Sequence, residues 1–412
     1  METEKKYWFG ILPHVYYVKK GRRMLLYNTL DGAYIITSDS IAIDFVEEMH
    51  QKKNLGVVEL TEQRLNNPAL AQFASECCKK NICRLQEQEP NQPKPVQLMP
   101  VLNLQRDVEK LKEDPGRSVG EGIMDYLTDV TIILNRNCRR NCPECGNFNR
   151  QFFHCSKGEG KHELDAKDVI GFLETIRYAP LRRLAFTGGD IFSYSQWDKL
   201  KPYLDENGIC PILGIHYQNI TEACLVRLGD FPLEIFVPSP INKDVFSEKL
   251  SLIGQREAKY IFSVTSEEDC AAVEDIVEEH HISKCEFAPF YDKKNLDFFK
   301  KQVFTTREDI LESTISQRVI FARQKMNTNF FGQVVIFPNG DLKANPNGST
   351  LGNIRHDHIA KMLEKELVGT ESWRCIRNNR LCSECLFQFL CPSPSNYEIV
   401  MERDNLCTDN NG

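Results

Sequence analysis

Val130-Thr-Ile-Ile-Leu134 followed by Cys138-Arg-Arg-Asn-Cys142-Pro-Glu-Cys145 is the stretch that decides the fold. Its first part is an almost continuous apolar run, which is typical of a strand buried on both faces of a parallel sheet. Its second part is a loop that carries three cysteines in a C-x3-C-x2-C spacing. Because open α/β sheets and barrels place their active sites in loops that follow the strands, the stretch predicts an α/β fold with a functional site at this loop.

The three cysteines of this loop have the spacing of metal ligands. Three thiolates can hold three corners of a [4Fe-4S] cube, and the fourth iron then has no protein ligand and is open to chemistry. A zinc knuckle is the alternative, because His154 or Cys155 could supply the fourth ligand that a closed zinc site needs. A disulfide is disfavoured, since closely spaced cysteines in a chain without a secretory signal are more often metal ligands than bridges.

Length and composition exclude several classes of protein. With 412 residues, the chain is expected to form two or three domains. No run approaches the roughly twenty apolar residues of a membrane span. The first residues, Met1-Glu-Thr-Glu-Lys-Lys6, contain no secretory signal, so we expect a cytoplasmic protein without a membrane partner. The net charge of -7 argues against a general nucleic-acid binder, because phosphate contacts require a basic face.

The chain from residue 129 to 325 alternates apolar strands with amphipathic helices. This rhythm indicates a parallel sheet, and six strands predict a partial (β/α)6 TIM-like barrel whose functional groups lie at the strand ends. One helix is expected over Ala166–Tyr178, capped by Asp165, and another over Glu268–His280. The six candidate strands are Val130–Leu134, Arg183–Phe186, Pro211–Ile215, Glu234–Pro238, Tyr260–Val264 and Cys285–Phe290.

Residues 1–85 predict a small α+β domain. Alternating apolar and polar residues between 10 and 36 predict an antiparallel meander, a helix follows over Ile41–Met49, and a short strand at Val57–Leu60 precedes further helices. This order resembles the winged-helix element that recognises leader peptides, and such an element would take a peptide by strand addition. The alternative is a cap that only packs on the next domain. Residues 86–128 are polar and proline-rich at their start and predict a linker, with one helical excursion at Asp107–Lys112.

The C-terminal part, residues 326–412, holds a second group of cysteines. Val334–Asp341 predicts a hairpin with an Asn-Gly turn. Cys382, Cys385 and Cys391 follow in a C-x2-C-x5-C spacing, with Cys407 behind them. Four thiolates could close an auxiliary [4Fe-4S] cluster, and a zinc ribbon built from the same four residues is the alternative.

Residues 129–410 resemble the radical S-adenosylmethionine (radical SAM) superfamily, in its branch with a C-terminal SPASM extension. The resemblance rests on the three-cysteine loop, on Thr187-Gly188-Gly189-Asp190 where this superfamily has a Gly-Gly-Glu stretch, and on the C-terminal cysteine pattern. It implies an enzyme that uses a 5′-deoxyadenosyl radical to take a hydrogen atom from a ribosomally made precursor peptide. It also implies S-adenosylmethionine contacts at Gly188, Gly189, Asp190 and Ser239. The implied cluster ligands are Cys138, Cys142 and Cys145 for the primary [4Fe-4S] cluster, and Cys382, Cys385, Cys391 and Cys407 for one auxiliary cluster.

The chain departs from this superfamily at several positions. Glu144 stands where an aromatic residue usually lies over the adenine of the cofactor, and Asp190 is shorter than the usual glutamate. Ala344-Asn-Pro346 and Ser395 stand where proteins with a further auxiliary cluster have cysteines. Neither segment easily replaces a thiolate on iron, so Cys375 is left without an evident ligand set.

The sequence as a whole is most similar to the Bacteroidales pseudo-radical-SAM proteins of Gly-Gly-type peptide-modification systems, through stretches such as Leu26–Ala33, Asn103–Asp107 and Asp114–Ser118. That family implies an alternative function, a catalytically degenerate partner that binds the precursor peptide and assists a second, active radical SAM maturase. Asp190 and Glu144 favour the degenerate partner, whereas the intact C-x3-C-x2-C loop favours the enzyme.

Overall fold

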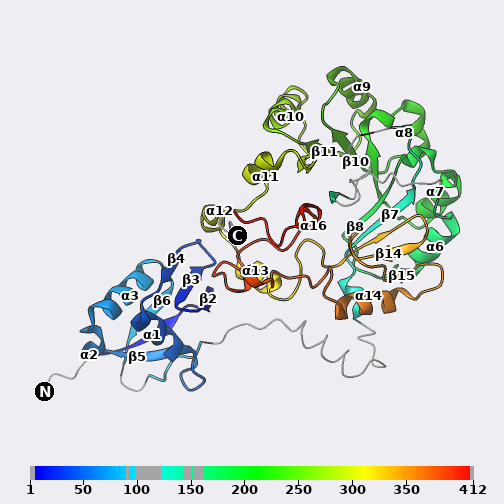
Figure 1. Cartoon of the computed structure of the whole chain (residues 1–412). Coiled ribbons are helices and arrows are strands. Elements are labelled where there is room, and N and C mark those ends of the chain that lie inside the picture. Colours follow the sequence, from blue (N-terminus) through cyan, green and yellow to red (C-terminus); the bar gives the residue numbers. More distant parts are fainter. Residues whose placement is uncertain are drawn as a thin grey trace.

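The computed structural model describes residues 5–89, 92–97, 122–140, 142, 151–152 and 162–408, and it is a mixed α/β structure built on one large sheet (Figure 1). The described strands of this sheet are in the order β12-β11-β10-β9-β8-β7-β13-β14-β15 and leave it open at both edges. Six of them run parallel and neighbour one another in sequence order, which confirms the predicted arc of parallel strands. These six are β7 (Asp129–Asn135), β8 (Arg183–Gly188), β9 (Ile212–His216), β10 (Leu233–Pro238), β11 (Ala258–Val264) and β12 (Cys285–Pro289).

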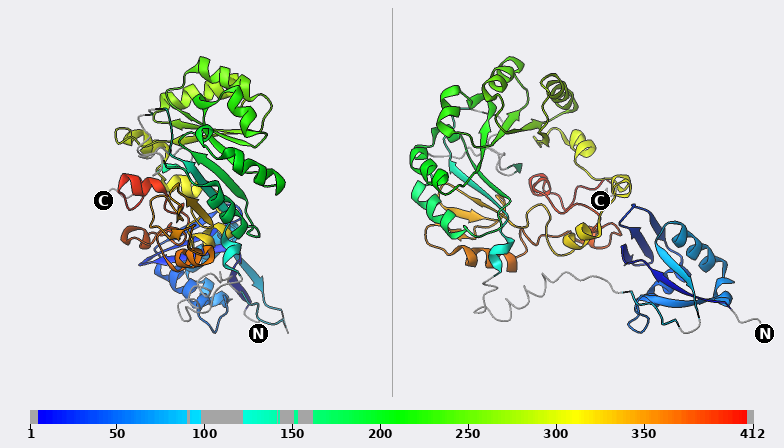
Figure 2. Two further views of the ribbon diagram at one scale, coloured as in Figure 1. Left: turned by 90° about the vertical axis from the view of Figure 1, so that its right-hand side faces the viewer. Right: turned by 180° about the vertical axis from the view of Figure 1, so that it is seen from behind.

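Amphipathic helices alternate with these strands and cover the convex side of the sheet (Figures 1 and 2). Asp165 caps the first of them as predicted, since its carboxylate accepts a hydrogen bond from the backbone N–H of Lys167 at 2.9 Å. The helices are α6 (Ala166–Thr175), α7 (Trp197–Glu206), α8 (Glu222–Leu228), α9 (Lys243–Ile253) and α10 (Glu267–Glu279). Short 3-10 helices precede β7 and follow β8 and β9; they are η1 (Ile123–Tyr126), η2 (Ile191–Ser193) and η3 (Tyr217–Asn219).

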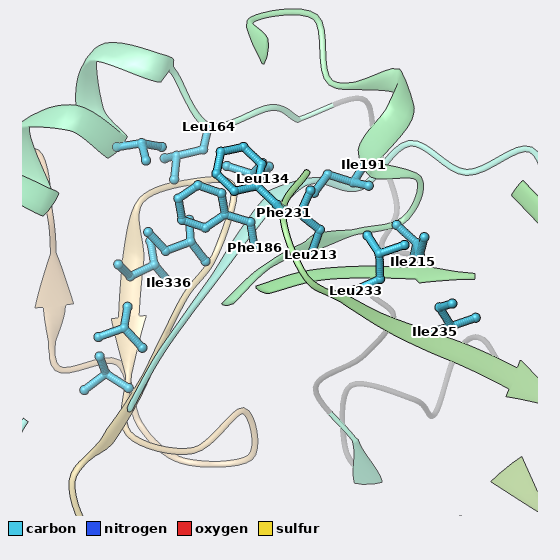
Figure 3. Close-up of a cluster of buried hydrophobic side chains, with 14 of the residues drawn as sticks. Leu134, Leu164, Phe186, Ile191, Leu213, Ile215, Phe231, Leu233, Ile235 and Ile336 are labelled. Atoms are coloured by element: carbon cyan, nitrogen blue, oxygen red, sulfur yellow. The ribbon is translucent and has the colours of Figure 1, made fainter. Parts of the chain in front are cut away.

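Side chains alternate between the two faces of the sheet, so each strand contributes to two clusters. Ile235 and Val237 of β10 belong to the large core under the helices, part of which is drawn in Figure 3. Phe236, between them, points to the opposite face and joins a smaller apolar cluster. The concave face of the sheet is therefore apolar beside the strand ends. The other members of this smaller cluster are Phe152, Ile261, Ala288 and Phe290.

The C-terminal residues extend the large sheet at β7. β13 (Gln333–Ile336) pairs with β7 in parallel, and β14 (Asp341–Lys343) and β15 (Gly352–Asn353) continue in antiparallel fashion. The predicted Asn-Gly hairpin is present, and Gly340 occupies its turn with a φ of 88° that favours glycine. The large sheet thus continues past residue 325. The remaining helices are α11 (Leu296–Gln302), α12 (Arg307–Glu312), α13 (Gln317–Arg323), α14 (Ile359–Val368), α15 (Arg380–Ser383) and α16 (Asn396–Met401).

The N-terminal residues form an α+β unit with its own core. It contains two three-stranded antiparallel sheets, one in the order β5-β1-β6 and one, the predicted meander, in the order β2-β3-β4. Its helices include the predicted one, which Asp39 caps by accepting hydrogen bonds from two backbone N–H groups. The elements are β1 (Lys6–Ile11), β2 (Val15–Lys20), β3 (Arg23–Asn28), β4 (Tyr34–Thr37), α1 (Ser40–His50), β5 (Val57–Thr61), α2 (Glu62–Leu65), α3 (Pro68–Lys79) and β6 (Cys83–Glu87).

The β2-β3-β4 sheet of this unit packs against two later segments of the chain, residues 310–320 and 386–390 (Figure 1). The hydroxyl of Tyr27 donates to the carbonyl of Ser313 at 2.7 Å and accepts from the N–H of Ile315 at 2.9 Å. The Nζ atom of Lys20 donates to Oε1 of Gln388 at 3.1 Å. Both faces of β3 are thus buried, one in the core of the unit and one in this contact. The shared apolar cluster consists of Tyr16, Leu25, Tyr27, Ile310, Ile320, Leu386, Phe387 and Leu390.

Two further predictions concern a helix in the linker and the absence of a membrane span. The helix expected at Asp107–Lys112 lies outside the described residues. Across the part of the chain that the structure describes, no helix is long and apolar enough to cross a membrane.

Candidate functional site

Two of the three cysteines of the predicted loop lie at the carboxyl edge of the parallel strands. Cys138 follows the end of β7 by three residues, and its Sγ atom accepts from the backbone N–H of Arg140 at 3.3 Å. The Sγ atom of Cys142 lies 3.7 Å from Nε2 of His216, the last residue of β9. Cys142 also packs against the apolar cluster on the concave face. Cys145, together with Glu144, His154 and Cys155, lies outside the described residues.

Gly188 and Gly189, at the end of β8, lie directly against the segment that leads into the cysteine loop. A Cβ atom on Gly188 would come within 2.6 Å of Oδ1 of Asn135, and one on Gly189 within 2.5 Å of the carbonyl oxygen of Asn137. Neither distance is tolerated by real side chains, so both positions require glycine. The two glycines therefore allow the segment that leads into the cysteine loop to lie close against the end of β8.

Asp190 follows these glycines and is held within its own turn. Its carboxylate accepts from the backbone N–H of Phe192 at 3.2 Å, and its carbonyl accepts from Nδ2 of Asn135 at 2.9 Å. Burial raises the pKa of the Asp190 carboxyl, and the charges of Arg139 and Arg140 oppose this shift. Asp190 thus joins the ends of β7 and β8 and faces the basic residues of the cysteine loop.

Ser239, the predicted ribose contact, lies just after β10. Its backbone N–H donates to the carbonyl of Ser263 at 3.1 Å, so it continues the pairing of β10 with β11 for one residue. It shares the carboxyl edge with the glycines, two strands away in the sheet.

His216 is a site residue that the sequence interpretation missed. Its side chain is only 5% exposed, and burial together with the charge of Arg140 lowers its pKa to about 4, so the ring is neutral at pH 7. Nδ1 accepts from the backbone N–H of Gln218 at 3.2 Å. A neutral imidazole that accepts at Nδ1 carries its proton on Nε2, and that N–H is directed at the sulfur of Cys142. The signal in the sequence was its position directly after the Pro211–Ile215 strand.

Arg140 ties the cysteine loop to the neighbouring strand end. Its Nε donates to Oδ1 of Asn219 at 2.9 Å, and its guanidinium also donates to the carbonyl of Gln218. Both acceptors belong to η3, the short helix after β9. Arg140, which lies between Cys138 and Cys142, therefore anchors the cysteine loop to η3.

An apolar wall flanks Cys142 on the concave face. Phe152 packs with Phe236 and Phe290, at ring-centroid distances of 6.4 and 6.1 Å. Tyr397 of α16 stands edge-on to Phe152, and its hydroxyl donates to the carbonyl of Pro289 at 2.7 Å. Figure 2 shows α16 inside the arc of the sheet. The C-terminal part thus contributes Tyr397 to the apolar wall beside Cys142.

The four C-terminal cysteines line one pocket of about 20 Å³. Cys382 is on α15, whose first turn is capped by Asn379 through a 2.8 Å hydrogen bond from the N–H of Cys382. Cys407 is brought to the pocket because its segment bridges to Thr305, whose N–H donates to the carbonyl of Leu406 at 2.8 Å. Cys375 is not among the lining residues. Those residues are Thr305, Arg377, Cys382, Cys385, Gln388, Cys391, Asn405, Leu406 and Cys407.

Arg377 places a buried positive charge beside these thiols. Its guanidinium forms a 2.7 Å ion pair with Glu398, and the two side chains are 8% and 6% exposed. Gln388 donates to the backbone carbonyl of Arg377 at 2.6 Å, which fixes this segment against the loop between Cys385 and Cys391. Burial raises the pKa of Cys391 to about 12, and Arg377 opposes the shift.

The donor set of this pocket fits a metal cluster with four thiolate ligands. Burial raises the pKa of Cys385 and of Cys391, so a bound cation is what would stabilise these two thiolates. In the described ranges, no three His, Cys, Asp or Glu side chains converge as a single metal ion requires. The four thiols nevertheless line one pocket.

Among known proteins, similarity to this chain is found at the level of solved structures. No family model matches the chain. No curated protein matches it. Among solved structures, Streptococcus suis SuiB bound to precursor peptide SuiA is similar, with 12% identity, a TM-score of 0.46, and coverage of 98% of this chain and 99% of that chain. SuiB bound to S-adenosylmethionine has 12% identity, a TM-score of 0.41 and coverage of 98% and 99%. AdoMet-bound anSMEcpe has 14% identity, a TM-score of 0.43 and coverage of 64% and 84%. These values are too low to carry the assignment, which rests on the residues of this chain.

Proposed function

We propose that this chain is an iron-sulfur protein of the radical SAM type that modifies a ribosomally made peptide. The observation that most supports this proposal is that the carboxyl ends of three neighbouring strands bring the candidate residues together. β7 delivers Cys138 and Cys142, β8 delivers the two glycines under them, and β9 delivers His216. A thiolate loop at the carboxyl edge of an open parallel sheet is where such a fold positions chemistry.

The primary cluster would be held by Cys138, Cys142 and Cys145, which leaves one iron without a protein ligand. With S-adenosylmethionine bound there, the cluster and the cofactor would supply the hydrogen-atom abstraction from the peptide that the resemblance implies. His216 would donate its N–H to the sulfur of Cys142, and Arg140 would hold the loop in place.

The S-adenosylmethionine contacts in this proposal are Gly188, Gly189, Asp190 and Ser239. All four lie at the carboxyl ends of β8 and β10, on the edge that carries Cys138 and Cys142. The partly buried carboxylate of Asp190 is an acceptor for the ammonium group of the cofactor.

Residues 326–412 would form a SPASM-type domain with one auxiliary [4Fe-4S] cluster on Cys382, Cys385, Cys391 and Cys407. The four thiols share a pocket, and the buried charge of Arg377 lies beside them. A closed set of four ligands suits electron transfer or structural support rather than substrate binding. The same four thiols also suit zinc, which metal analysis distinguishes.

Residues 1–85 would bind the leader of the precursor peptide, residues 86–128 would serve as linker, and residues 129–325 would form the catalytic partial barrel. The support in the N-terminal unit is the edge strand β4, which pairs only with β3 among the described strands. An extended peptide could add to this edge. The contact of the same sheet with the C-terminal part would then bring the peptide toward the barrel.

The deciding experiment is anaerobic reconstitution of the full chain with iron and sulfide, followed by dithionite and S-adenosylmethionine. We expect 5′-deoxyadenosine to form in the wild type and to be absent in Cys138→Ala. If the wild type loads its clusters but forms none above the level of that variant, the enzymatic proposal is wrong. Precursor-peptide binding without 5′-deoxyadenosine would instead indicate the degenerate partner of a second maturase.

A further inference from the structure

A third group of thiols lies in the N-terminal unit, outside both proposed cluster sites. Cys77 and Cys78 occupy the last turn of α3, and Cys83 begins β6. The connection between them is a tight helix-terminating turn. The N–H of Ile82 donates to the carbonyl of Cys77 at 2.9 Å, and the N–H of Asn81 donates to that of Cys78 at 3.2 Å.

This pair of hydrogen bonds defines a Schellman motif, and Asn81 adopts the left-handed φ of 51° that the motif requires. The motif reverses the chain within three residues. Consequently, Cys83 returns onto the last helical turn, and its Sγ atom lies 3.2 Å from that of Cys78. β6 holds Cys83 there, because it pairs with β1 at Ile11.

We propose that Cys78 and Cys83 form a reversible disulfide that locks the end of α3 to the start of β6. This site goes beyond the proposed function, which uses neither thiol. A disulfide needs its sulfurs at about 2.05 Å, so the pair must close by about 1 Å, a shift within reach of side-chain rotation. Cys77 is 1% exposed and Cys83 is 6% exposed, whereas Cys78 is half-buried and is the thiol that an outside reagent meets first.

The oxidant is a small-molecule disulfide. The thiolate of Cys78 attacks one of its sulfurs, which forms a mixed disulfide and releases one small thiolate. The thiolate of Cys83 then attacks the Cys78 sulfur, which forms the protein disulfide and releases the second small thiolate. The two small thiolates take up the two protons that the cysteines lose, so two thiols are oxidised and one small disulfide is reduced. Burial raises the pKa of Cys78 to about 12, so the exchange is slow at neutral pH and needs long equilibration.

The proposed disulfide lies next to a groove of about 370 Å³ on the same unit. β6 contributes Arg84 and Gln86 to this groove, and Trp8 and Ile11 of β1 line it as well. Because Arg84 directly follows Cys83, the disulfide would fix one wall of the groove to α3. Oxidation is therefore expected to increase the amide-exchange protection of the start of β6.

Tryptic mapping of the full-length chain tests this disulfide without any variant. Lys79 and Lys80 lie between the two cysteines, so trypsin places Cys83 in the peptide Asn81–Arg84, separate from Cys78. After equilibration with oxidised glutathione and alkylation of free thiols, we expect the two peptides to remain linked and to separate on reduction. Cys83 that stays fully alkylatable at the most oxidising glutathione ratio would overturn the proposal.

Three single variants assign the partner, because Cys77 and Cys78 share one tryptic peptide. Cys78→Ser is expected to abolish the link, whereas Cys77→Ser keeps it. Cys210→Ser, at an exposed thiol elsewhere in the chain, is the matched control and also keeps it. A link that survives in Cys78→Ser and is lost in Cys77→Ser would assign the bond to Cys77 and contradict the proposed pair.

Discussion

Cys142 and Cys391 belong to the two proposed cluster sites, and their surroundings differ. Cys142 faces the neutral imidazole of His216 and an apolar wall on the concave side of the sheet. Cys391 lies in a pocket of four thiols beside the buried guanidinium of Arg377. The first site thus offers a neutral N–H donor that lies near the cationic Arg140, whereas the second offers a buried guanidinium that is paired with Glu398.

This difference indicates what each site can do. A thiolate cluster is anionic, so a buried cation next to the four-cysteine pocket stabilises a closed, permanently bound group. The loop after β7 is anchored by the hydrogen bonds of Arg140 to η3 and by the glycine contacts at the end of β8. Under the proposed function, the first site would carry the turnover and the second would give support.

The largest expected effect comes from removing one thiol at each site. Cys142→Ala and Cys385→Ala should each halve the iron content of the reconstituted protein, if both sites hold iron-sulfur clusters. Iron per chain, measured with zinc on the same samples, checks this. Unchanged iron in Cys142→Ala would mean that only the C-terminal pocket loads. Loss of zinc rather than iron in Cys385→Ala would identify the pocket as a zinc site.

The next effect concerns the ion pair that distinguishes the pocket. Arg377→Gln leaves Glu398 buried without its partner, and breaking a buried pair in this way costs about 3–5 kcal/mol of unfolding free energy. Urea unfolding of the protein measures the loss. Glu257→Gln is the matched control, because it breaks a solvent-exposed pair with Lys284, and such pairs contribute little to stability. Equal losses in the two variants would show that Arg377 has no special role.

The sequence predicted those parts of the structure that depend on local pattern. All six parallel strands were predicted, because each is an apolar run followed by a turn and an amphipathic helix. The cap at Asp165 and the Asn-Gly hairpin were predicted for the same reason. The spacing of Cys382, Cys385, Cys391 and Cys407 grouped them in the sequence, and all four line one pocket, whereas their role as cluster ligands stays a prediction.

Other features depend on contacts between distant residues, and no local pattern reveals them. β6 is largely exposed, so its sequence lacks the apolar alternation that marks a strand. Its pairing with β1 is likewise not revealed by any local pattern. His216 becomes a site residue only because β9 lies two strands from β7, which places it against Cys142. The glycine pair packs against Asn135 and Asn137, a contact between the ends of two strands that no local pattern reveals.

The smallest effect tests the neutral donor at the first site. His216→Phe keeps an aromatic ring but removes the Nε2–H that points at the sulfur of Cys142. A hydrogen bond to a cluster sulfur stabilises the electron-rich reduced state, so its loss should lower the reduction potential of the primary cluster by on the order of tens of millivolts. Potentiometric titration followed by electron paramagnetic resonance measures this shift. Tyr217→Phe, which removes a hydroxyl from the adjacent ring that pairs with Gln218, should leave the potential unchanged. A shift of the same size in both variants would attribute the effect to η3 as a whole, and the imidazole would then have no distinct role beside the cluster.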